Sequence, residues 1–89
     1  MLSDDTLAGL AEVDGWVVDG TIATFRPVDA GWRATVMYRE VYGKHHCRWH
    51  MALIDPRRHC REVSIRSRLA DARRLAESRV RAENRPRAA

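Results

Sequence analysis

The chain has 89 residues, enough for one small domain. Hydrophobic residues make up 45% of it and charged residues 31%, a balance that argues against intrinsic disorder. Its apolar runs are far shorter than the ~20 residues that span a bilayer. Its first five residues, Met1–Asp5, include two aspartates and no basic residue, and no apolar signal segment follows them. We therefore expect a cytoplasmic protein without a membrane partner.

The charge is distributed unevenly along the chain. The formal net charge is +4, but residues 1–56 carry 5 basic and 8 acidic groups (net −3), whereas residues 57–89 carry 11 basic and 4 acidic groups (net +7). Such asymmetry is typical of chains with a polyanionic partner. It is also what an acidic sheet packed on a basic helix would produce.

A short helix is predicted near the start. Ser3 can cap it, and Asp4 and Asp5 suit the positive end of a helix dipole. Leu7 and Leu10 then form a short apolar stripe, and Asp14–Gly15 ends it. The pattern predicts about two helical turns.

Three tryptophans set the next expectation. Trp16, Trp32 and Trp49 are separated by 16 and 17 residues, an interval that fits one strand and one turn. Each lies at or near the start of a strand-like run. The spacing predicts a three-stranded meander.

Within the first run, 16–27, the dipeptide Asp19–Gly20 allows two interpretations. It is a strong signal for a hairpin turn, which would add a fourth strand, and it also fits a glycine bulge in one bent strand. The second run, 32–39, alternates between apolar and polar positions. So does the third, 46–53, which places Cys47 and Trp49 on one face and leaves the other polar, until Asp55–Pro56 ends it.

The last element is predicted to be an amphipathic helix over about 65–84. Its apolar stripe consists of Ile65, Leu69, Ala72, Ala76 and Val80, and two i, i+4 ion pairs, Glu62–Arg66 and Glu77–Arg81, would support it. The fold class is therefore α+β: a short N-terminal helix, a three-stranded or possibly four-stranded antiparallel meander sheet, and a C-terminal amphipathic helix packed on one face. We expect one domain over 1–84 and a frayed basic tail over 85–89.

The order helix, three strands, helix resembles the topology of double-stranded RNA-binding domains. Those domains begin their second helix with a lysine-rich stretch, where Ser64–Arg68 holds only Arg66 and Arg68. Their loop between the first two strands contains glycine and proline, where this chain has Val28–Gly31. The resemblance concerns element order alone, so we assign no family and take no function from it.

The only cluster of metal-ligand residue types consists of His45, His46, Cys47, His50, His59 and Cys60. Strand alternation places Cys47 and His50 on opposite faces, although His46 and His50 could share an ion with His59 or Cys60 from the following loop. We expect no metal and no cofactor, and interpret the cysteine as a core residue and the histidines as residues of a solvated face. No arrangement of nucleophile, base and orienting group supports catalysis, so we expect no enzyme.

Arginines are the remaining candidate binding residues. Arg57, Arg58 and Arg61 form a tight group before the last helix, and Arg48 would join them if that loop folds back beside the third strand. The predicted contact set for nucleic acid or a partner is Arg48, Arg57, Arg58, Arg61, Arg66 and Arg73.

Two functions compete. The sequence narrowly favours a small non-enzymatic module that binds nucleic acid or a nucleoprotein complex through these arginines, with Tyr38 or Tyr42 stacking on bases. The alternative is a protein-binding accessory factor or inhibitor of the kind that phages and mobile elements encode, which could be a homodimer. Its contact surface would be an unpaired edge strand or the polar sheet face, made of His46, Arg48 and His50, with Arg33 and Arg39 if the strand register allows.

Overall fold

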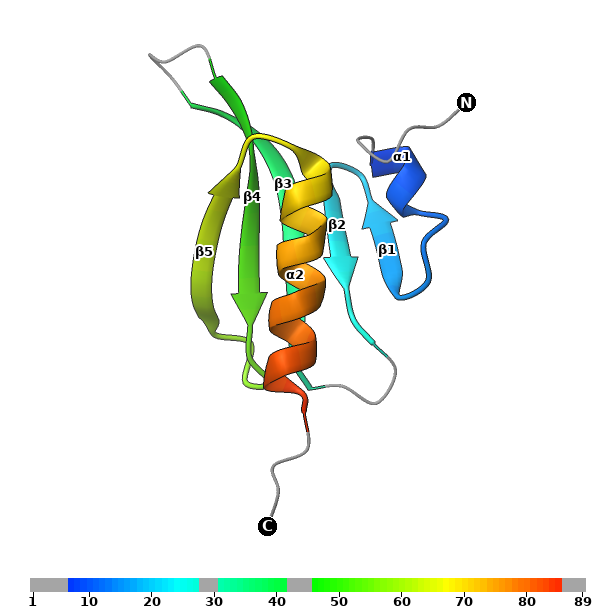
Figure 1. Cartoon of the computed structure of the whole chain (residues 1–89), viewed down its shortest axis with the longest axis vertical. Coiled ribbons are helices and arrows are strands. Elements are labelled where there is room, and N and C mark those ends of the chain that lie inside the picture. Colours follow the sequence, from blue (N-terminus) through cyan, green and yellow to red (C-terminus); the bar gives the residue numbers. More distant parts are fainter. Residues whose placement is uncertain (1–6, 28–30, 42–45, 86–89) are drawn as a thin grey trace.

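The computed structural model describes residues 7–27, 31–41 and 46–85, with the backbone alone at 40, 41, 46 and 47. The elements are α1 (Leu7–Leu10), β1 (Trp16–Asp19), β2 (Ile22–Phe25), β3 (Arg33–Val41), β4 (His46–Ile54), β5 (Cys60–Arg66) and α2 (Leu69–Glu83). The five strands form one antiparallel sheet in sequence order, and α2 lies along one face of it (Figure 1). The predicted α+β class is confirmed, but the sheet has five strands rather than three or four.

The first additional strand comes from a hairpin at Gly20. Asp19 pairs with Ile22, which leaves a loop of only two residues between β1 and β2. Gly20 has a φ of +62°, and a glycine with positive φ at the first loop position is what a type II′ hairpin turn requires. Of the two interpretations of Asp19–Gly20, the hairpin is correct.

The second additional strand, β5, occupies residues that were predicted to be a loop and the start of the last helix. Val63 and Ile65 alternate with Glu62 and Ser64, and this period of two places Ile65 in the strand, on the opposite side of the sheet from α2. The predicted Glu62–Arg66 pair is therefore wrong. Glu62 instead accepts a hydrogen bond from Nε of Arg79 on α2, at 3.0 Å.

The tryptophan interval was also misinterpreted. Two short strands, β1 and β2, lie between Trp16 and Trp32, and Trp49 lies inside β4 rather than at its start. Trp16 does open β1, and Trp32 directly precedes β3. With five strands, the element order also departs from the order on which the resemblance to double-stranded RNA-binding domains depends.

The core lies between α2 and the sheet. On α2 the buried residues are Leu69, Ala72, Ala76 and Val80, the predicted stripe without Ile65. The sheet meets them with Trp16, Ala23, Phe25, Ala34, Val36, Met51 and Leu53. Because the centre of the helix stripe is alanine, the helix backbone can approach the sheet closely, and the larger side chains fill the two ends.

Residues near both ends of the described part of the chain contact the rest of the fold. Leu10 of α1 is 1% exposed. The description of α1 begins at Leu7, so the predicted cap Ser3 and the start of the expected two turns lie outside the described residues. At the other end, the side chain of Asn84 accepts a hydrogen bond from the Trp32 backbone N–H at 3.1 Å. It also donates one to the Trp32 carbonyl at 3.4 Å. The predicted tail from Pro86 onward is outside the described residues as well.

The described helices are too short to cross a bilayer: α2, the longer one, has 15 residues.

Candidate binding surface

The sheet has one face that no helix covers in the described part of the chain, and we call it the helix-free face. Four large aliphatic side chains are exposed on it: Val17 (66% exposed), Ile22 (36%), Val63 (59%) and Ile65 (40%). The strand register places them together on this side, since each pairs with a residue of the same face: Val17 with Thr24, Ile22 with Met37, Ile65 with His50 and Val63 with Ala52. Half-buried side chains fill the area between them.

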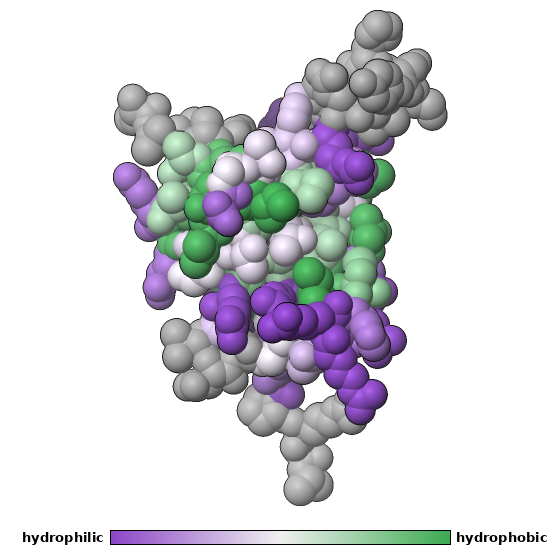
Figure 2. Space-filling view, turned by 180° about the vertical axis from the view of Figure 1, so that it is seen from behind, coloured by the Kyte–Doolittle hydropathy of each residue, from purple (hydrophilic) through white to green (hydrophobic). Residues whose placement is uncertain are grey.

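Figure 2 shows this face directly. Hydrophobic and neutral residues spread across it from one edge of the sheet to the other, and hydrophilic residues gather at its upper right and along its lower border. Antiparallel sheets with one solvated face normally carry polar side chains there. This face departs from that pattern, because Val17, Ile22, Val63 and Ile65 are exposed on it.

The charges on the helix-free face are mostly positive. Among the described residues that the strand register places there, Arg33, Arg39 and Arg48 are cationic and Asp19 is the one anion. Arg39 and Arg48 are directly opposite each other on β3 and β4, and both are exposed. Like charges in this position destabilise a sheet, and neither arginine has a carboxylate partner among the described residues.

His50 lies next to this arginine pair. It is two residues after Arg48 on the same face of β4, and it pairs with Met37 on one side and with Ile65 on the other. Its Nε2 atom is buried and has no hydrogen-bond partner among the described residues. Buried polar atoms are nearly always paired in folded proteins, so an orphan of this kind needs an explanation.

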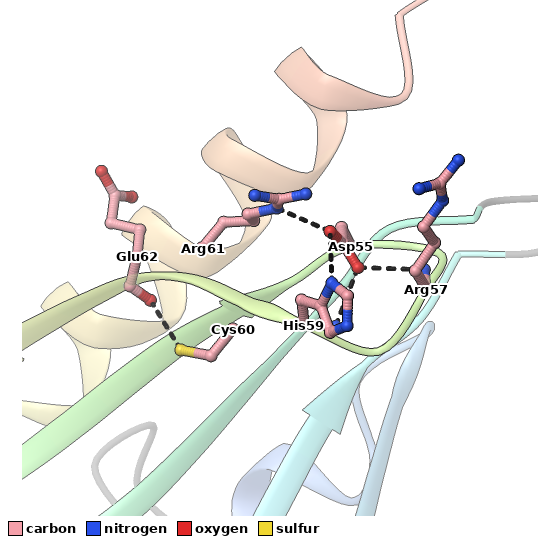
Figure 3. Close-up of polar contacts among 6 residues, drawn as sticks. All are labelled: Asp55, Arg57, His59, Cys60, Arg61 and Glu62. Atoms are coloured by element: carbon pink, nitrogen blue, oxygen red, sulfur yellow. Dashed lines mark hydrogen bonds and ion pairs between the residues drawn. The ribbon is translucent and has the colours of Figure 1, made fainter.

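The turn between β4 and β5 is built around Asp55, which is 3% exposed (Figure 3). One oxygen of its carboxylate accepts hydrogen bonds from the backbone N–H groups of Arg57 (2.9 Å) and His59 (2.8 Å). The other accepts one from Nε of Arg61 at 2.6 Å. Arg58, which lies between Arg57 and His59, adopts a φ of +68°. The carboxylate therefore stabilises a tight turn with a backbone conformation that residues other than glycine rarely adopt.

These contacts also determine the ionisation of Asp55. The backbone N–H of His59 is the strongest influence, and it lowers the pKa of the carboxyl below its usual range. Burial opposes this effect, while Arg61 and the Arg57 N–H lower the pKa further. Asp55 is therefore an ionised, structural residue. The sequence indicated it only as the end of a strand.

The structure does not bring the six predicted arginines together. Arg57, Arg58 and Arg61 are at the β4–β5 turn, and Arg61 is bound to Asp55. Arg48 and Arg66 are at the other end of these strands, since Trp49, next to Arg48, pairs with Arg66. Ile54 lies six positions after Arg48 on β4, a distance of ~20 Å, so the expectation that Arg48 joins the turn is wrong.

Arg73, the sixth member of the set, is on the other layer of the molecule. It is on α2, where its Nε lies 3.3 Å from a carboxylate oxygen of Glu77. That oxygen also accepts a hydrogen bond from Trp16 Nε1 at 2.8 Å. Glu77 thus pairs with Arg73 rather than with the predicted Arg81, which is instead placed over the Phe25 ring, 5.6 Å from its centroid.

Sequence reasoning identified part of the helix-free face and missed the rest. The protein-binding alternative included Arg33 and Arg39 if the register allowed, and the register does place both on the face of Arg48 and His50. Val63 and Ile65 were missed because their strand was not recognised. The alternation of Val63 and Ile65 with Glu62 and Ser64 was the signal that could have found them.

The predicted metal cluster does not converge. The side chains of His45, His46 and Cys47 are outside the described residues. Even so, β4 runs from His46 to Ile54, and Ile54 is the residue that pairs with Cys60. His46 and the pair His59–Cys60 are therefore at opposite ends of a strand of ~26 Å, and the described residues contain no group of three metal-ligand side chains.

Comparison of the chain with models of known protein families, with curated proteins and with solved structures found no match.

Proposed function

We propose that this chain is a non-enzymatic binding protein, that its contact surface is the helix-free face, and that its partner is a protein. The observation that carries the proposal is the position of Val17, Ile22, Val63 and Ile65, which are all exposed on that one face. Contiguous exposed apolar surface on a small protein is typical of an interaction site. Full burial of each such side chain stabilises a complex by about 1.5–3 kcal/mol, so even partial burial of four makes a useful contribution.

The strand register makes a protein partner a better fit to this face than nucleic acid. Proteins that bind single strands stack bases on aromatic side chains, and the described residues of the helix-free face include no Phe, Tyr or Trp. Of the two aromatic residues suggested for stacking, Tyr42 lies outside the described residues. Tyr38 is on the α2 side and packs edge-on against Trp49, with the ring centroids 5.0 Å apart. We therefore prefer protein binding to nucleic-acid binding, whereas the sequence alone narrowly favours nucleic acid.

Nucleic-acid binding remains a second proposal, and the ordered β4–β5 turn supports it. Asp55 fixes the turn from which Arg57 and Arg58 extend into solvent, so their guanidinium groups are partly preorganised for phosphate. The test is a titration with labelled duplex DNA and duplex RNA at low and near-physiological salt. Binding that weakens steeply with salt and is reduced in Arg57→Gln/Arg58→Asn supports this function, and binding unchanged in that variant contradicts it.

The main proposal is tested by affinity capture with the full chain from an extract of the organism that encodes it. Three baits are compared: the natural chain, Val63→Thr/Ile65→Thr, and the control Arg74→Gln/Ala82→Ser on exposed positions of α2. Threonine keeps the β-branched shape that suits a strand. The proposal predicts a protein that the natural chain and the control retain and the strand variant loses. A partner retained equally by all three baits would contradict it.

A further inference from the structure

Building on the proposed function, we propose that the partner is an acidic amphipathic segment. Its carboxylates would bind Arg39 and Arg48, and its apolar side chains would cover Val63 and Ile65. Three features of the helix-free face favour this partner: its positive charge, the pairing of its two arginines and the line of apolar residues that leads away from them.

The arginine pair suits two carboxylates. Residues directly opposite on antiparallel strands have Cα atoms about 4.5–5.5 Å apart, so the side chains of Arg39 and Arg48 leave the sheet at nearly the spacing of side chains one helical turn apart, about 5–6 Å. In the free protein the pair is repulsive. An anionic partner converts this repulsion into charge-assisted hydrogen bonds.

His50 adds a third polar group at the same place. Its Nε2 has no partner among the described residues and is beside Arg48 on the same face. Rotation of the ring towards the surface would let this nitrogen bond to an incoming carboxyl group. The orphaned atom thus gains the partner that the described part of the free chain does not supply.

The apolar part of the site extends along β4 and β5. Ile65 beside His50 and Val63 beside Ala52 form a strip that continues to Ile54. From Arg48 to Ile54 this strip is ~20 Å long, which corresponds to a helix of about 13 residues. Such a helix would lie over β4 and β5 on the side opposite α2 and would complete a third layer.

A second copy of the chain fits this face poorly. Arg39 and Arg48 are at one end of it, and Arg33 is at the other, with Arg57 and Arg58 in the turn beyond. Two copies packed face to face with aligned strands would oppose arginine to arginine in either direction. Charge complementarity therefore selects an acidic partner over self-association.

The experiment measures fluorescence anisotropy of labelled probes with the full chain at low salt. The first probe is a peptide of about 14 residues with leucine at helical spacing and glutamate elsewhere. One control replaces glutamate by lysine, a second replaces leucine by glutamine, and a third probe is single-stranded DNA of similar length. We expect the first peptide to bind at least about tenfold more tightly than every other probe.

Matched variants locate the contact. Arg39→Gln/Arg48→Gln is expected to weaken binding of the first peptide at least about tenfold. Arg74→Gln/Arg85→Gln removes the same charge from exposed positions of α2 and the residues after it and is expected to leave binding unchanged.

Three results would overturn the inference: equal binding of the glutamate and lysine peptides, equal loss in the two double variants, or tighter binding of DNA that depends on Arg39 and Arg48. If the first peptide fails to bind while the Val63→Thr/Ile65→Thr bait still loses its captured protein, the proposed function stands and this inference falls.

Discussion

Gly15 shows how one residue sets the start of the sheet. Its φ is +88°, and a Cβ placed on it would lie 2.9 Å from the Phe25 ring. We predict that Gly15→Ala destabilises the fold by roughly 2–4 kcal/mol, because backbone strain and overpacking add. Gly20→Ala is the matched control, since Gly20 also has a positive φ but a Cβ placed on it would have no atom within 4 Å. This substitution should lower the free energy of unfolding by about 1 kcal/mol. Urea denaturation measures both, and equal losses would show that the contact with Phe25 is unimportant.

Asp55 makes a pH-dependent contribution to the stability of the fold. Its pKa is lowered in the folded protein, so its stabilising effect is fully present above the ordinary carboxyl pKa of about 3.9 and is lost as the pH falls through the lower folded value. We predict that Asp55→Asn lowers the thermal midpoint at neutral pH and that the two proteins converge below about pH 4. Thermal unfolding across this pH range tests the sign, and a difference that is constant with pH would contradict the role of the charge.

At the scale of elements, Asn84 connects the end of α2 to the start of β3. It makes two hydrogen bonds with the Trp32 backbone, and the one it accepts is the shorter. We predict that Asn84→Ala destabilises the protein by about 1–2 kcal/mol. Asn84→Asp keeps an oxygen that can accept the hydrogen bond from the Trp32 N–H, so it should destabilise the protein less. Chemical denaturation should give this order; a larger loss for aspartate would mean that the donated bond dominates.

The elements that the sequence predicted well are those with a long, regular pattern. The stripe from Leu69 to Val80 identifies α2, and the alternating runs predicted at 32–39 and 46–53 lie almost entirely within β3 and β4, which have nine residues each. The short strands were the difficult ones. β1 and β2 have four residues each, too few for periodicity to separate a hairpin from a bulge. Ile65 fits both the stripe of α2 and the alternation of β5, and only the pairing of β5 with β4 decides between them.

At the scale of the whole molecule, the candidate site depends on neighbours that are distant in the sequence. Arg39 and Arg48 become neighbours through the β3–β4 register, and Val63 and Ile65 join them only through β5. The net charge of +7 over residues 57–89 instead pointed to that segment as the binding region. The arginines of that segment are divided among a turn, the end of β5 and α2, which is why charge alone did not locate the surface.

The arginine pair predicts a trade-off between stability and binding. Replacing both residues in Arg39→Gln/Arg48→Gln removes a repulsion and should raise the free energy of unfolding by about 0.2–1 kcal/mol, while it weakens binding. Added salt should reduce this difference by screening the exposed charges. Urea denaturation at low and high salt tests the prediction, and a less stable variant would show that the two arginines support the fold.

The most direct test of the helix-free face is to map by NMR where the acidic amphipathic peptide binds. In ¹H–¹⁵N spectra of the full chain, we predict that the largest chemical-shift changes on titration occur on the helix-free face, with little change along the exposed side of α2. The residues expected to shift most are Met37, Arg39, Arg48, His50, Val63 and Ile65. Shifts concentrated at the Arg57–Arg61 turn or on α2, with these strand positions unchanged, would show that the helix-free face is not the binding surface.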